Sequence, residues 1–117
     1  MADVKMKNTF VDVELETGEV VKATLTYYHL LQLKNKHKDI YDRYNKIMVK
    51  GPQDEFDNLT IIYTGYLCAV LAESSIEDAM SEEEFICAFT PDREYTGQIL
   101  SQLINPKKAK ASANRSN

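Results

Sequence analysis

Alternating apolar and polar positions at the start of the chain predict a β-hairpin over residues 9–26. Val11, Val13 and Leu15 alternate with acidic residues, which places the apolar side chains on one face of a strand. Residues 16–19 include a glycine and read as a tight turn, and the return strand again alternates, with Thr24 on its polar face. Two strands alone are marginal in water. The apolar face is therefore expected to rest on helices, or the edge to pair with another subunit.

Helical periodicity follows the hairpin, and the chain is predicted to form helices at residues 27–50, 53–72, 82–89 and 91–105. In the first, apolar residues step by three and four and form a single stripe; its members are Leu30, Leu33, His37, Ile40, Tyr44 and Ile47. Thr26 is placed to cap this helix, and Gly51-Pro52 is placed to end it.

The second helix is apolar almost all round from Leu59 onward, which is typical of a helix covered on most sides. In so small a chain, complete cover is expected to draw on neighbouring subunits. Gly65 costs roughly 1 kcal/mol relative to alanine inside a helix, so we expect another backbone to approach closely there. Ser81 and Glu84 match a capping box at the start of the third helix. Thr90 and Pro91 predict the start of the fourth.

These elements define the fold class as α+β, mainly α: an N-terminal β-hairpin followed by a bundle of about four helices. With 117 residues the chain has the size of one domain, predicted at residues 1–105. Residues 106–117 lack large apolar side chains and carry four basic ones, and they are expected to form a disordered basic tail.

The charge distribution argues against nucleic-acid binding. Residues 1–105 hold all 18 acidic residues and 10 basic ones, so the domain has a net charge of −8 and would repel a phosphate backbone. The longest nearly uncharged stretch, residues 59–72, is too short to span a bilayer, and the start of the chain lacks the apolar region of a secretory signal. We therefore expect a cytoplasmic protein without membrane contact.

No catalytic or metal-binding motif is visible. His29 and His37 are eight residues apart, whereas metal-binding pairs on a helix lie three or four apart. Cys68 and Cys87 lie in apolar helical patterns and are interpreted as reduced core thiols, with a disulfide as the minor alternative. The glycines form no phosphate-binding loop. We expect a non-enzymatic protein that uses no metal or cofactor.

Three segments resemble one known family. They are Leu25-Thr26-Tyr27-Tyr28, the apolar stretch Ile61-Ile62-Tyr63-Thr64-Gly65-Tyr66-Leu67, and Met80-Ser81-Glu82-Glu83-Glu84-Phe85. Their order looks like that of the tail assembly chaperones of long-tailed (siphovirus-like) bacteriophages and prophages, over roughly residues 8–105. The resemblance implies an oligomeric protein of the host bacterial cytoplasm, absent from the mature virion. Such a protein binds the tape-measure protein, keeps its helices soluble and assists assembly of the tail-tube protein.

Under this hypothesis the predicted client contacts are Tyr63, Tyr66, Phe85 and Phe89, and the hairpin edge is the predicted oligomerisation surface. The alternative for the four rings is an ordinary place in the core. Other functions also stay open: a structural virion component such as a tail-completion or head–tail joining protein, a small acidic regulatory module that binds a basic partner, and a small enzyme.

Overall fold

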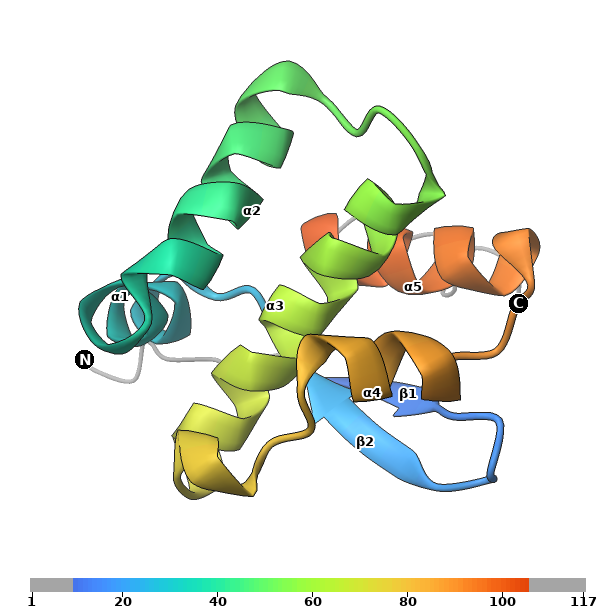
Figure 1. The fold of residues 1–117 in the computed structure, drawn as a ribbon, viewed down its shortest axis with the longest axis horizontal. Helices are drawn as coiled ribbons and strands as arrows, with labels where there is room; N and C mark the ends of the chain where they lie inside the picture. The colour runs from blue at the N-terminus through green and yellow to red at the C-terminus, as the bar shows by residue number, and fades with distance from the viewer. Residues whose placement is uncertain (1–9, 106–117) are drawn as a thin grey trace, which may run out of the picture.

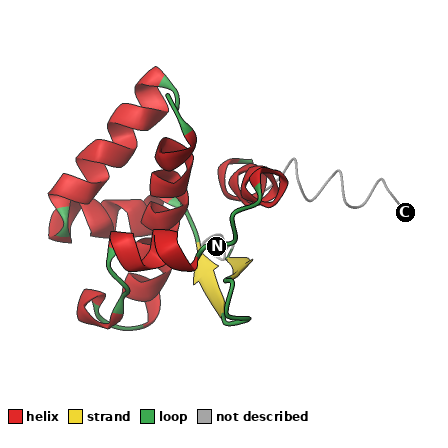
Figure 2. Cartoon of the chain, turned by 45° about the vertical axis from the view of Figure 1, so that its right-hand side comes forward, coloured by secondary structure: helices red, strands yellow, loops and turns green. Residues whose placement is uncertain are grey.

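The computed structural model describes residues 10–105, in which a hairpin and a set of helices surround one central helix (Figures 1 and 2). The elements are β1 (Val11–Glu14), β2 (Val20–Ala23), α1 (Tyr27–Lys36), α2 (Lys38–Lys50), α3 (Glu55–Glu73), the short 3-10 helix η2 (Ile76–Asp78), α4 (Glu82–Ala88) and α5 (Arg93–Ile104). The predicted class, α+β and mainly α, is confirmed. The predicted basic tail at 106–117 lies outside the described residues.

The hairpin forms as predicted, with Val13 opposite Val21 and Gly18 at φ 92° in the turn. Its apolar face rests on α3 of the same chain. The N–H of Glu14, on the side of β1 away from β2, donates to the Tyr95 hydroxyl (2.7 Å), and the N–H of Glu16, just after β1, donates to the Ala88 carbonyl (2.8 Å). The outer edge of β1 is thus partly occupied by its own chain, and oligomerisation through the hairpin stays a prediction.

The close crossing expected at Gly65 is present. The backbone N–H of Thr24 donates to the Gly65 carbonyl at 3.0 Å, and a Cβ at position 65 would lie 3.3 Å from the Cβ of Ala23. Thr24 was predicted on the polar face of the hairpin and is instead fully buried, because the chain leaves β2 at this point and packs against α3.

The prediction of one helix over residues 27–50 is wrong. The helix breaks at His37 (φ −143°, ψ 72°), giving α1 and α2, which pack against each other and both against α3. An unbroken helix of this length would extend about 36 Å. The change of direction at His37 instead lets both helices pack against α3, and it places Leu33 and Tyr44 in one core.

Helix α3 is buried on all sides between Leu59 and Ala69, as its sequence predicts. Its neighbours are β2, α1, α2, α4 and α5 of the same chain, so the burial of α3 does not depend on another subunit (Figure 1). Among the helices between residues 10 and 105, none combines the length and apolar character that crossing a membrane requires.

Of three helix starts for which the sequence predicted the capping residue, the structure agrees with one and differs from two. Ser81 and Glu84 form the predicted capping box of α4. Asp92, and not Thr90, caps α5 by accepting from the N–H groups of Glu94 and Tyr95, because the helix begins after Pro91. Thr26 occupies the N-cap position of α1 but makes no side-chain cap, and within the described residues its buried hydroxyl has no hydrogen-bond partner.

Candidate functional site

The four aromatic residues predicted to contact a client lie together, but inside the core. Each side chain of Tyr63, Tyr66, Phe85 and Phe89 is no more than 6% exposed. Phe85 stacks on Tyr66 with 5.0 Å between ring centroids, and it also lies 5.5 Å from Tyr63 and 5.9 Å from Phe89. In this conformation the rings join α3 to α4. A client touches only exposed atoms, so it has little access to them. Client contact at them stays a prediction that would require the core to open.

The two tyrosine hydroxyls hold the connection between η2 and α4. The Tyr63 hydroxyl donates to the Met80 carbonyl, and the Tyr66 hydroxyl accepts from the Met80 N–H, both at 2.8 Å. Burial, with a smaller contribution from nearby Glu82, raises the pKa of Tyr63 to about 12. At neutral pH this phenol is therefore protonated and serves as a structural hydrogen-bond donor.

Phe89 also reaches a surface hollow. Together with Phe56 and Ile86 it lines an opening of about 310 Å³ where the start of α3 meets the end of α4. Of the four predicted contacts, only Phe89 lines this hollow, and its own ring is buried.

The two thiols and the two imidazoles lie in different surroundings within the described residues. Burial raises the pKa of Cys68 to about 12, so its reactive thiolate is absent at neutral pH. Cys87 was interpreted as a core thiol and is instead exposed, because α4 buries its Phe85 face and turns Cys87 outward; both thiols are free. His29 is buried, which lowers its pKa, and His37 lies at the helix break. Within residues 10–105, no three His, Cys, Asp or Glu side chains gather as metal ligands would.

Exposed apolar side chains gather on α1 and α2 instead. Among the described residues, five of the eight large hydrophobic ones that are exposed belong to these two helices: Tyr27, Tyr28, Leu31, Met48 and Val49. Three of them, Tyr27, Leu31 and Met48, border a hollow of about 560 Å³ between the helices, which we call the α1–α2 groove. Tyr27 is 89% exposed, so most of its ring is available for contact.

The walls of the α1–α2 groove are mainly aromatic and aliphatic, with one amide, Asn45, and one cation, Lys34. Tyr44 forms part of its lining, and burial raises the pKa of this residue to about 12. Lys34 extends over the Tyr41 ring with its Nζ 5.6 Å from the ring centroid, a cation–π arrangement. Among residues 10–105, no acidic side chain lines this groove. The groove can thus accept an apolar surface and favours negative charge near it.

The sequence contained one indication of this groove, in apolar residues that lie outside the predicted stripe of residues 27–50. Tyr27, Leu31 and Met48 are apolar but fall outside the stripe assigned to a single buried face. Once the helix breaks at His37, these positions on α1 and α2 come together and remain exposed.

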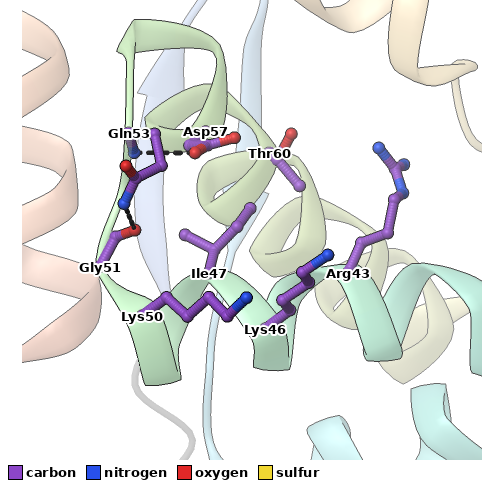
Figure 3. Close-up of a pocket in the computed structure, with 8 residues that line it drawn as sticks. All are labelled: Arg43, Lys46, Ile47, Lys50, Gly51, Gln53, Asp57 and Thr60. Atoms are coloured by element: carbon purple, nitrogen blue, oxygen red, sulfur yellow. Dashed lines mark hydrogen bonds between the residues drawn. The ribbon is translucent and has the colours of Figure 1, made fainter.

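A second hollow, the α2–α3 cleft, lies on the other side of α2 and has a volume of about 310 Å³ (Figure 3). Arg43, Lys46 and Lys50 of α2 line this cleft, and the Lys46 and Lys50 side chains lie along the helix (Figure 3). On the opposite side, Asp57 accepts a hydrogen bond from the Gln53 N–H at 2.8 Å. Three cations at a spacing of three and four residues therefore face one concave surface.

Only one of these three cations is neutralised within the described part of the chain. Arg43 forms an ion pair with Glu82 of α4, which also accepts from the Thr60 hydroxyl at 3.1 Å. Lys46 and Lys50 form no ion pair with any residue between 10 and 105. Their charges are available to an external anion.

Helices α1 and α2 carry a net positive charge, whereas the other described residues carry a net negative charge. Residues 27–50 carry six basic and two acidic side chains, a net charge of +4. Residues 10–26 and 51–105 together carry two basic and fifteen acidic ones, a net charge of −13. Both hollows that α2 borders therefore belong to a basic region, and the other described residues are strongly acidic.

Comparisons of this chain with models of known families, with curated proteins and with solved structures find no match.

Proposed function

We propose that the protein is a phage tail assembly chaperone without enzymatic activity, which binds helices of the tape-measure protein in its α1–α2 groove and so assists tail-tube assembly. The observation that carries this proposal is the concentration of exposed apolar side chains around that groove. An amphipathic helix can lay its apolar stripe into such a groove, with anchors spaced one turn apart. The resemblance of the three sequence segments to this chaperone family supports the same client.

The side chains around the groove suit a client with many similar helices. Tyrosine offers a large ring with a polar tip at low entropic cost, and methionine adapts its shape to different partners. Tyr27, Tyr41 and Met48 supply these properties here. The net charge of −13 elsewhere on the described chain would keep a chaperone–client complex dispersed.

The test is co-expression with the tape-measure protein encoded beside this chain, measuring the fraction of tape-measure protein that stays soluble and co-purifies. Substitutions at Tyr63 or Phe89 would disrupt the core, so the informative variant is Leu31→Gln with Met48→Gln. The matched control is Val20→Thr with Phe56→Gln. The groove pair is 53% and 40% exposed, and the control pair, which does not line the groove, is 55% and 63% exposed.

We expect wild type and control to hold the client in solution at a fixed stoichiometry, and the groove variant to lose most of it. Insoluble tape-measure protein beside a chain that purifies alone would remove the proposal. Recovery of the chain in purified particles would favour a structural virion component instead.

A further inference from the structure

The surface of α2 changes character around its C-terminal turns. Successive residues of a helix are rotated by about 100°, so Met48, Val49, Lys46 and Lys50 follow one another around the axis. Met48 borders the α1–α2 groove, while Lys46 and Lys50 enter the α2–α3 cleft. Val49, 76% exposed, lies between them on the outer face. The end of α2 is thus a ridge with an apolar side and a cationic side.

We propose that this ridge selects client helices in which acidic residues accompany the apolar anchor, with the acidic side chains entering the α2–α3 cleft beside Lys46 and Lys50. The inference rests on the proposed function and names the chemistry of its partner. A helix that crosses α2 places its apolar residues over Met48 and Val49. Its carboxylates then reach the two lysines that lack an ion pair within the described chain.

The geometry sets a spacing for the client. Groove and cleft lie on opposite sides of α2, and a helix with its side chains is about 10 Å across. A crossing helix rises about 1.5 Å per residue, so acidic residues roughly seven positions from the apolar anchor would reach the cleft. The basic region of residues 27–50 favours the same sign of charge on approach.

The charge on the walls of the α2–α3 cleft limits the number of client carboxylates that it can bind. Arg43, Lys46 and Lys50 face a single carboxylate, Asp57, in the lining, and Arg43 is shared with Glu82. Lys46 and Lys50 have no ion pair within residues 10–105, so each can pair with one client carboxylate. Exposed ion pairs contribute little each, so we expect them to select among clients whose affinity comes mainly from the groove.

The test measures binding of three labelled synthetic helical peptides by fluorescence anisotropy. All three share one leucine stripe, and one of its leucines is the anchor that is placed over Met48 and Val49. The peptides differ only in a pair of residues about seven positions from this anchor, and the pair is Glu, Gln or Lys. We expect the Glu peptide to bind wild type roughly threefold to tenfold more tightly than the Gln peptide, with the Lys peptide weakest. This difference should shrink as salt rises.

Charge reversal at the cleft should reverse the order. Lys46→Glu with Lys50→Glu should favour the Lys peptide, and the neutral pair Lys46→Gln with Lys50→Gln should abolish the preference. Lys36→Glu is the matched control, because Lys36 ends α1 as Lys50 ends α2 but lines neither hollow. This control should keep the wild-type order.

The outcomes separate the inference from the proposed function. If the three peptides bind wild type equally but Leu31→Gln with Met48→Gln weakens them all, the groove binds helices and the charge inference is overturned. If a Glu pair placed three residues from the anchor binds as well as one placed seven away, the crossing geometry is wrong. If no peptide binds, both proposals fail.

Discussion

Gly65 and Gly97 both lie inside helices, yet a side chain would meet very different surroundings at the two positions. At Gly65 a Cβ would lie 3.3 Å from the Ala23 Cβ and 3.4 Å from the Thr24 nitrogen, and both of these neighbours are tied to the backbone of the hairpin. At Gly97 a Cβ would have nothing within 4 Å. Replacement of each glycine by alanine therefore compares two effects. At Gly97 only helix propensity changes, whereas at Gly65 crowding against the hairpin is added to it.

We predict that Gly97→Ala raises the free energy of unfolding by up to about 1 kcal/mol, because alanine restricts the unfolded chain and favours the helix. Gly65→Ala should instead lower it by roughly 1–2 kcal/mol, since crowding against β2 outweighs the same gain in propensity. Urea denaturation of both variants measures the difference. A stabilised Gly65→Ala variant would show that the crossing of α3 and the hairpin has room to spare.

Among the elements, α4 depends on contacts made outside its own short sequence. Seven residues form too few backbone bonds to be stable alone, so α4 relies on its capping box and on the burial of Phe85. The Tyr63 and Tyr66 hydroxyls bind Met80, just before the helix begins. They fix the direction in which the chain enters α4.

We predict that Tyr66→Phe lowers the free energy of unfolding by about 1–2 kcal/mol, because it leaves the part-buried Met80 N–H without its acceptor. Tyr95→Phe is the control: its hydroxyl accepts from the exposed N–H of Glu14, which water can satisfy, so its loss should cost less than about 0.5 kcal/mol. Equal losses in urea denaturation would contradict this role of burial.

For the molecule as a whole, buried titratable groups limit stability at both ends of the pH scale. Burial raises the pKa of Tyr44, Tyr63 and Cys68 to about 12 each. In the unfolded chain these groups lose their protons at the ordinary values of 10.0 and 9.0, so the folded state holds more protons in between. Burial lowers the pKa of His29 from 6.5, so the unfolded chain binds more protons below that pH.

We therefore predict that the free energy of unfolding is greatest near neutral pH. It should fall as pH rises above about 9, and these acids would continue to lower it up to about pH 12. The His29 contribution should be lost as pH falls below 6.5 toward the lowered pKa. Urea denaturation between pH 5 and pH 11 tests this, with Cys68→Ala expected to reduce the loss between about pH 9 and 10. A stability that stays constant from pH 8 to 11 would contradict it.

The sequence alone determined the features that depend on near neighbours along the chain. The alternation of Val11, Val13 and Leu15 specified a strand with one buried face, and Ser81 with Glu84 specified the start of α4. Gly65 inside an apolar helix indicated a close crossing, which the structure contains. For the strand and the cap, the physical cause lies within a few neighbouring residues. For the crossing, it lies in glycine itself, because the lack of a side chain allows another backbone to approach.

Only the tertiary structure decided which apolar residues are covered. Periodicity shows that a helix has an apolar face, but it does not show where the chain turns back, and no glycine or proline marks the break at His37. The change of direction at His37 brings Tyr27 and Met48 to one exposed groove, while Tyr63, Tyr66, Phe85 and Phe89 are buried where α4 packs on α3. Burial is a property of elements that meet in space, and residues far apart in sequence decide which of them meet.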